Sequence, residues 1–76
     1  MKLYAGGYLT FFMPEQQPEI ERVLPEPTAL DDLLRSLGIP PGEVQLVIIN
    51  GEIAELTQAQ IHDQDVVKVF PGVDGG

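Results

Sequence analysis

The sequence predicts a small α+β domain in which one helix lies across a single sheet. Three observations support this class: an aromatic, strand-like start, one leucine-rich amphipathic segment in the middle, and two valine- and isoleucine-rich runs in the second half. Seventy-six residues form one domain, near the lower limit for a self-sufficient core. A helix between two pairs of strands can cover one face of a mixed sheet, with the first and last strands adjacent in its middle.

The N-terminal part predicts a hairpin. Residues 2–12 are rich in leucine, tyrosine and phenylalanine, which favours a strand, and Gly6-Gly7 indicates a bulge or bend within it. Residues 19–24 predict the second strand, separated from the first by a polar loop with two prolines. With Lys2 toward water, Tyr4 should share its exposed face.

The central helix follows Pro25-Glu26-Pro27. We expect Thr28 to cap its N-terminus and Gly38 to end it in a left-handed conformation. The buried face should be formed by leucines at i, i+3, i+4 and i+7, namely Leu30, Leu33, Leu34 and Leu37.

The next strand is predicted at Val44–Ile49, with a tight turn at Asn50-Gly51 and a short returning strand at Glu52–Ala54. If Gln45 points outward, strict alternation divides the strand between two faces. Val44, Leu46 and Ile48 should then face the core, and Val47 and Ile49 should lie on the opposite face.

The last strand is predicted at residues 66–70. With Lys68 toward water, Phe70 shares its face, so Phe70 and the outward Val47 and Ile49 form an apolar surface patch. Such patches often mark interaction sites, although ordinary exposed sheet residues are the alternative interpretation.

The chain beyond Phe70 predicts a flexible arm. Proline cannot donate to a sheet ladder and glycine weakens ordered structure, so the sheet should end near Phe70. We therefore divide the chain into a domain at residues 1–70 and a tail at residues 71–76, although a frayed terminus is the simpler alternative. The tail consists of Pro71, Gly72, Val73, Asp74, Gly75 and Gly76.

Composition excludes several functions. Twelve acidic residues against four basic ones give a net charge of −8, which lacks the basic footprint of a nucleic-acid binder and disfavours an anionic membrane. No cysteine is present to act as a thiol nucleophile or to ligate zinc. His62 beside Asp63 is a lone histidine, which cannot build an ordinary metal site, so we interpret it as a loop residue. We expect a cytoplasmic protein that binds no metal or cofactor itself.

Over nearly its whole length the chain resembles the ubiquitin-like β-grasp sulfur carriers of the ThiS/MoaD family. The resemblance rests on Thr28-Ala29-Leu30-Asp31-Asp32-Leu33-Leu34, on Leu37-Gly38-Ile39-Pro40, on Ile49-Asn50-Gly51, and on Asp65-Val66-Val67-Lys68-Val69-Phe70-Pro71 running on to Gly75-Gly76. Phe-Pro before a Gly-Gly end is closer to the molybdopterin-synthase small subunit than to the thiamine carrier. That branch usually has a second proline where this chain has Gly72.

The resemblance implies a β-grasp fold with four to five strands and a carrier that is not itself an enzyme. Gly76 would be adenylated by a ubiquitin-activating-type enzyme that uses ATP, and a sulfur donor protein would then convert it to a thiocarboxylate. An acceptor synthase subunit would receive the sulfur for molybdopterin-type or, alternatively, thiamine biosynthesis. Partners would contact the tail residues 71–75 together with Phe70, Val47 and Ile49.

Two other functions use the same features. The chain could be a ubiquitin-like modifier joined through Gly76 to lysines of target proteins, because the same tail chemistry serves both roles. It could also be a plain binding module whose tail is inert.

Overall fold

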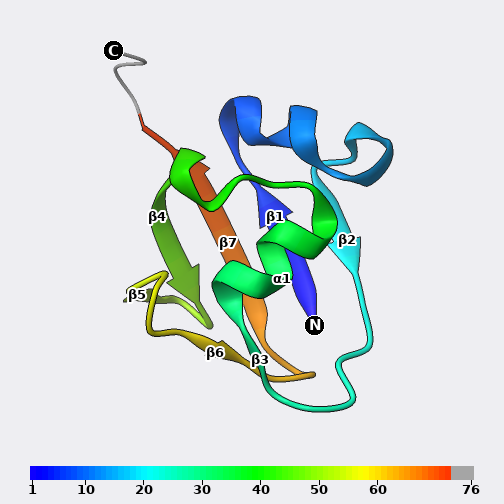
Figure 1. Ribbon diagram of the computed structural model, residues 1–76, viewed down its shortest axis with the longest axis vertical. Coiled ribbons are helices and arrows are strands. Elements are labelled where there is room, and N and C mark those ends of the chain that lie inside the picture. Colours follow the sequence, from blue (N-terminus) through cyan, green and yellow to red (C-terminus); the bar gives the residue numbers. More distant parts are fainter. Residues whose placement is uncertain (73–76) are drawn as a thin grey trace.

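The computed structural model describes residues 1–72, which form a five-stranded mixed sheet with one α-helix across it (Figure 1). The sheet strands are β1 (Lys2–Ala5), β2 (Glu19–Glu21), β4 (Val44–Ile49), β5 (Glu52–Ala54) and β7 (Val66–Pro71), in the order β2-β1-β7-β4-β5. The helix is α1 (Leu30–Leu37), and β3 (Thr28–Ala29) pairs with β6 (Gln60–Ile61) in a separate two-stranded sheet. Three 3₁₀ segments are η1 (Gly7–Phe12), η2 (Pro14–Gln16) and η3 (Pro41–Glu43).

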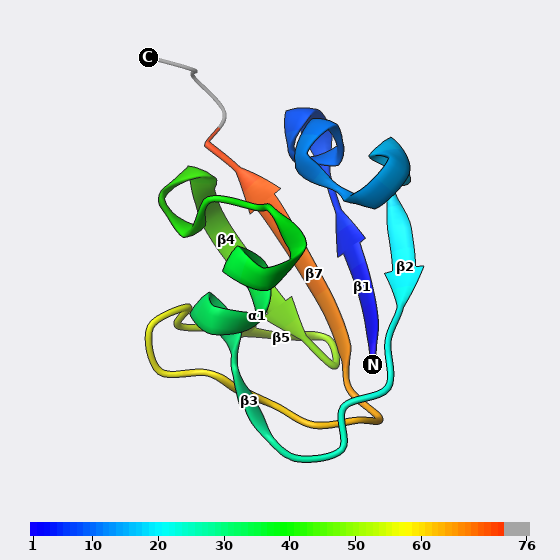
Figure 2. The same ribbon diagram turned by 45° about the vertical axis from the view of Figure 1, so that its right-hand side comes forward.

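The first and last strands lie side by side in the middle of the sheet, as predicted (Figure 2). They run parallel, with Leu3 opposite Val67, whereas the other pairs of neighbouring strands in this sheet are antiparallel. A parallel pair requires a crossover connection, and here the crossover carries α1. The predicted α+β β-grasp architecture, with its mixed sheet and single main helix, is therefore confirmed.

The first strand is shorter than predicted. It ends at Ala5, and the following residues form η1 instead of continuing the strand. Gly7 has a φ of +54°, which turns the chain out of the sheet, and the Thr10 hydroxyl donates to the Ala5 carbonyl at 2.9 Å. Within η1, Leu9 is buried while Phe11 is 69% exposed, a distribution that residue type alone does not reveal.

The second strand and the helix start also differ from prediction. β2 ends at Glu21, and Val23 beyond it is 83% exposed. Thr28 does not cap α1, because it pairs with Ile61 in the small sheet and its hydroxyl donates to the Glu26 carbonyl at 3.1 Å. Ala29 occupies the N-cap position instead.

The rest of the helix follows the prediction. Leu30, Leu33 and Leu34 are buried, and Leu37 packs against the core from a partly buried position. Gly38 ends α1 in a left-handed conformation with a φ of +91°, and its N–H donates to the Arg35 carbonyl.

β4 has its predicted bounds but not its predicted faces. A β-bulge lies between Val44 and Leu46 where β4 pairs with β7. One extra residue shifts the alternation by one position, which exchanges the two faces downstream. Val47 is therefore only 3% exposed and Ile49 packs against the core, so the prediction that both point away from it is wrong. Leu46, predicted to be buried, is 37% exposed.

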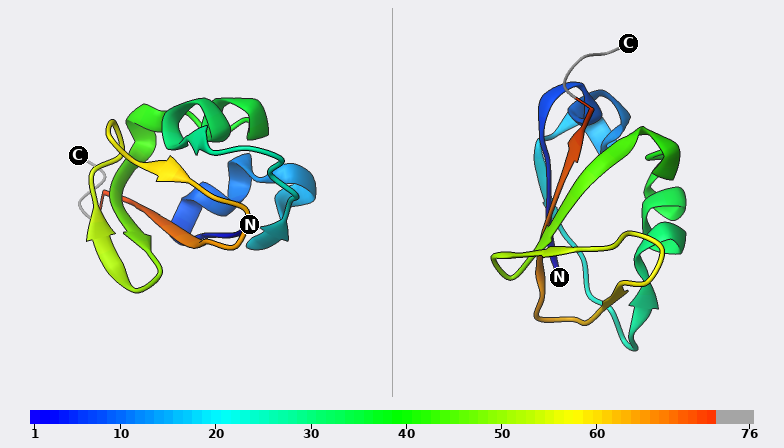
Figure 3. Two further views of the ribbon diagram at one scale, coloured as in Figure 1. Left: turned by 90° about the horizontal axis from the view of Figure 1, so that it is seen from below. Right: turned by 90° about the vertical axis from the view of Figure 1, so that its left-hand side faces the viewer.

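α1 covers one face of the sheet and leaves the other open (Figure 3). The core between them is apolar, and no buried polar side chain occurs in it within the described residues. It consists of Met1, Leu3, Ala5, Leu9, Met13, Ile20, Leu30, Leu33, Leu34, Ile39, Val47, Ile61, Val67 and Val69. Among residues 1–72, no helix has the length and hydrophobicity that crossing a membrane requires.

Candidate functional site

The root of the predicted tail lies at the end of β7. The strand continues one residue past the predicted boundary at Phe70, because Pro71 is paired with Val44 of β4. Gly72 follows next to Gln45, whose Oε1 lies 3.6 Å from where a Cβ on Gly72 would be. The remaining candidate residues, Val73, Asp74, Gly75 and Gly76, lie outside the described part of the chain.

Phe70 and Pro71 pack directly against the backbone of Gly6 and Gly7, a contact that we call the glycine seat. A Cβ on Gly6 would lie 2.5 and 2.8 Å from two ring atoms of Phe70, and one on Gly7 would lie 3.0 Å from Pro71 Cγ. The Gly6 N–H also donates to the Val69 carbonyl at 2.8 Å. Because a side chain would fill this space, the two glycines let the N-terminal backbone approach the tail root. Sequence reasoning assigned this pair to a bend and missed the contact.

A side-chain hydrogen bond joins two segments at the same end of the molecule as the tail root. The Tyr8 hydroxyl donates to the Glu43 carboxylate at 2.8 Å and so connects η1 with η3. This hydrogen bond, with a smaller contribution from repulsion by the carboxylate, raises the pKa of Tyr8 above its ordinary value. Tyr8 follows the glycine seat, and Glu43 directly precedes Val44, which pairs with Pro71. The bond therefore links the two segments that flank the tail root.

An apolar patch lies on the uncovered face of the sheet, next to Phe70, as predicted. The β4 residues in it are Leu46 and Ile48, and not the predicted Val47 and Ile49. We call it the open-face patch; it consists of Tyr4, Leu46, Ile48, Ile53, Val66 and Phe70. Leu46 lies opposite Phe70 across the strands, and the Tyr4 and Phe70 rings are 6.0 Å apart between centroids. Val47 belongs to the core and not to this patch.

Two of the four basic residues share this face. Lys68 lies opposite Ile48 and Lys2 lies opposite Val66, so both alternate with the patch residues. Glu19 and Glu21 of β2 lie on the same face, opposite Tyr4 and Lys2, and Glu19 is within 3.7 Å of Lys2. The open face is therefore apolar with charges of both signs, in a chain whose net charge is strongly negative.

A polar network occupies the opposite end of β7. Asp65 accepts from the His62 backbone N–H at 2.8 Å and from the Asn50 side chain at 2.9 Å, and Asn50 Oδ1 accepts from the Val66 N–H at 2.9 Å. The His62 N–H contributes most to holding the pKa of Asp65 below its ordinary value, followed by Asn50. This network joins the β4–β5 turn to the start of β7. His62 lies in the loop between β6 and β7, in agreement with its interpretation as a loop residue.

Comparison with known proteins places the chain in a family. The model of the ThiS family matches residues 9–76, which includes the predicted tail and all of the sheet except β1. No curated protein matches the chain. The match supports the general role of a small sulfur carrier that works with partner enzymes. The chain belongs to the ThiS family.

Proposed function

We propose that the chain carries sulfur as a thiocarboxylate on Gly76 and donates it in cofactor biosynthesis. The observation that carries this proposal is the family match, which runs through residue 76. The fold supports it, because the central strand β7 leads directly into the segment that ends at Gly76. Phe70 and Pro71 are seated on Gly6 and Gly7, so the segment starts from a rigid base.

The chemistry begins with a carboxylate that must be activated. A terminal carboxyl group has a pKa of about 3.3–3.7, so it is an anion and a poor electrophile near neutral pH. In the ubiquitin-activating-type partner, a carboxylate oxygen of Gly76 attacks the α-phosphorus of ATP, and pyrophosphate leaves. Sulfur at the oxidation level of sulfide, delivered by a sulfur donor protein, then attacks the acyl carbon. The new C–S bond replaces the C–O bond to AMP, which departs.

This chain supplies the reactive end and the surface that partners recognise, and the catalytic groups belong to the partners. Glycine at position 75 suits a tail that enters a narrow enzyme channel, because it has no side chain to obstruct the approach. The open-face patch includes Val66 and Phe70, which belong to β7, the strand that ends at the tail root. A partner that docks on this patch therefore has the tail within its reach.

Intact mass measures the proposed reaction directly. The purified chain is incubated with ATP, a ThiS-type activating enzyme and a sulfide source. We expect a mass increase equal to the exchange of one oxygen for sulfur, dependent on ATP and absent from a variant that lacks Gly75 and Gly76. If the full chain never gains this mass with any such activating enzyme, the proposal is refuted.

The acceptor is proposed to be a molybdopterin-type synthase subunit, because Phe70-Pro71 matches that branch better than the thiamine branch. The thiocarboxylated chain is offered separately to a molybdopterin-synthase large subunit and to a thiazole synthase. Sulfur should be released from Gly76 with the first and not the second. Release only with the thiazole synthase assigns the chain to thiamine biosynthesis instead.

The docking surface has its own test. Val66→Asn removes an apolar side chain from the open-face patch, and Val23→Asn is the matched control, since Val23 is 83% exposed but lies beyond β2. We expect the Val66 variant to raise the KM of the activating enzyme for the chain about 5–150-fold, in the range of an interface residue that contributes about 1–3 kcal/mol. Equal KM values for the two folded variants would remove the open-face patch from the proposal.

A further inference from the structure

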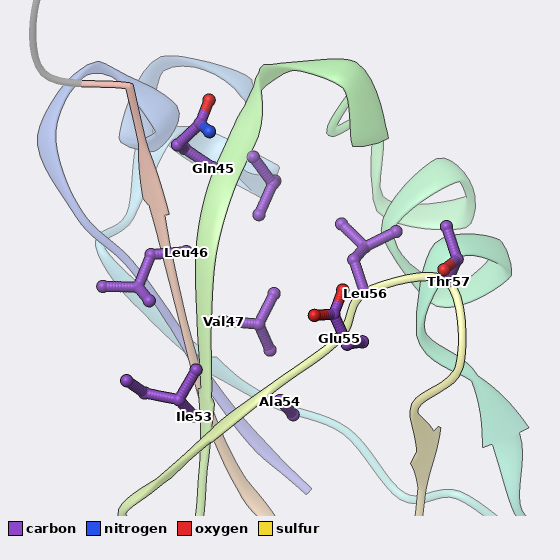
Figure 4. Close-up of a pocket in the computed structure, with 9 residues that line it drawn as sticks. Gln45, Leu46, Val47, Ile53, Ala54, Glu55, Leu56 and Thr57 are labelled. Atoms are coloured by element: carbon purple, nitrogen blue, oxygen red, sulfur yellow. The ribbon is translucent and has the colours of Figure 1, made fainter.

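We propose that a groove along the free edge of β4 binds an extended segment of a partner protein that carries a basic side chain next to an apolar one. The groove lies between β4 and the chain that leaves β5 (Figure 4). Its volume is about 270 Å³. It is lined by Val44, Gln45, Leu46, Val47, Ile53, Ala54, Glu55, Leu56 and Thr57, and we call it the β4-edge groove.

The groove contains a strand edge without a neighbour. β5 pairs with β4 only at residues 47–49, whereas β7 pairs with β4 along its other side as far as Val44. Within the described chain, residues 44–46 therefore have a strand on one side only; the Val44 N–H donates to the Pro41 carbonyl, so an added strand would pair with Gln45 and Leu46. The N–H and C=O groups of such an edge can pair with an added strand. Extended peptides bind to other proteins in this way, through main-chain hydrogen bonds and pockets for alternate side chains.

The size and floor of the groove favour a peptide over a small metabolite. Its volume lies below the range of about 300–1,000 Å³ that is usual for small-molecule sites. Val47, Ala54 and Leu56 supply apolar atoms, and Figure 4 shows Val47 and Leu56 on opposite sides of the hollow. A hollow of this kind accepts one or two apolar side chains of an extended segment whose backbone lies along β4.

The charge of the groove selects a basic partner. Glu55 is the one charged residue in the lining, and Glu43 directly precedes the strand. None of the chain's four basic residues lines it: Lys2 and Arg35 lie in ion pairs, Lys68 lies on the open sheet face, and Arg22 follows β2 at the opposite edge of the sheet. A lysine or arginine in the added segment therefore meets a carboxylate with no competing cation.

The chain's own C-terminal segment is the poorer occupant, because Asp74 and the carboxylate of Gly76 have the same charge as Glu55. The proposal also does not require any reaction at Gly76. It therefore stands or falls separately from the sulfur chemistry.

The test uses short peptides and the ¹⁵N-labelled full chain. The first probe is an acetylated hexapeptide that alternates valine with lysine. The second has glutamate in place of each lysine, and the third is the lysine peptide with every backbone nitrogen methylated, which keeps the charge but lacks all backbone N–H donors. We expect the first to bind with a Kd of about 0.1–1 mM and to shift the amide signals of Gln45, Glu55 and Thr57. The other two should bind at least tenfold more weakly.

Two variants complete the design. Glu55→Gln should weaken the lysine peptide about 2–5-fold, as expected for a solvent-exposed ion pair, whereas Glu26→Gln, which removes an exposed carboxylate elsewhere, should leave its Kd unchanged. Shifts centred on Val66 and Lys68 would place the peptide on the open sheet face and refute the proposal. Equal binding of the N-methylated peptide, or no binding of the lysine peptide at millimolar concentration, also refutes it.

Discussion

Replacing Gly6 with alanine tests whether the glycine seat holds the root of the tail. The added methyl group would lie 2.5 Å from Phe70 Cδ1 and 2.8 Å from Cε1. Carbon atoms pack at about 3.5–4.0 Å, so the ring must move by about 1 Å or more. The Tyr4 ring, with its centroid 6.0 Å from that of Phe70, limits this movement on one side. The backbone of Gly6 itself is unstrained, with a φ of −86°.

The expected cost follows from packing. Overpacking costs about 1–3 kcal/mol, and alanine returns about 0.4–1 kcal/mol by restricting the unfolded chain. We expect Gly6→Ala to lower the free energy of unfolding by about 1–2 kcal/mol, which lowers Tm by about 4–16 °C for a domain of this size. A chain of 76 residues has a total stability of about 4–11 kcal/mol, so the variant should remain folded.

The matched control is Gly42→Ala. A Cβ at Gly42 would have no atom within 4 Å, and its φ is not in the left-handed range. This variant should keep or slightly raise Tm, as measured by thermal unfolding followed by circular dichroism.

A double-mutant cycle then identifies the cause. In a Phe70→Ala background the ring is absent, so Gly6→Ala should cost nothing there, and the two substitutions should be non-additive by about 1–2 kcal/mol. If Gly6→Ala costs the same with and without the Phe70 ring, or as little as Gly42→Ala in the native chain, the seat is not a packing contact and the reasoning fails.

Three further predictions use other contacts. Gly38→Ala should lower Tm by about 4–16 °C, because a left-handed φ of +91° costs about 1–2 kcal/mol for a residue with a Cβ; an unchanged Tm contradicts this. The pKa of Asp65 is lower in the folded than in the unfolded chain, so its carboxylate stabilises the fold above about pH 4, and this stabilisation is lost as pH falls through the lowered pKa. The Tm advantage of the native chain over Asp65→Asn should therefore shrink below pH 4, and a constant difference argues against the network. Glu43→Gln should lower the pKa of Tyr8 toward its ordinary value, as followed by the NMR signals of its ring; no change would exclude their hydrogen bond.

Sequence alone was sufficient where local chemistry decides the structure. Asn50-Gly51 sits between two strand-like runs, and both residues adopt the positive φ, 52° and 85°, that a tight hairpin turn requires. Gly38 ends α1 for a similar reason. The order of such elements was enough to predict a mixed sheet with its first and last strands adjacent in the middle.

Sequence reasoning failed where a distant part of the chain competes with a local preference. Thr28 has the hydroxyl that usually caps a helix, but pairing with Ile61 commits its backbone to β3. Residues 7–12 have strand-forming composition, but a positive φ at Gly7 turns them into η1, where Leu9 reaches the core. The pairing of Thr28 leaves no local signal in the sequence, whereas Gly6-Gly7 did indicate a bend but not that the strand ends before it.

The bulge in β4 has the largest consequence for function, because it decides which residues a partner can reach. A strand with strict alternation would put Val47 and Ile49 beside Phe70 and bury Leu46. The extra residue near Gln45 instead brings Leu46 opposite Phe70 on the open face and leaves Val47 to pack next to Val69 under α1. It also lies in the part of β4 that β5 does not cover, so the same irregularity borders the open-face patch on one side and the β4-edge groove on the other. Since bulges often occur where a strand must redirect a side chain, this position connects the fold to both proposed partner surfaces.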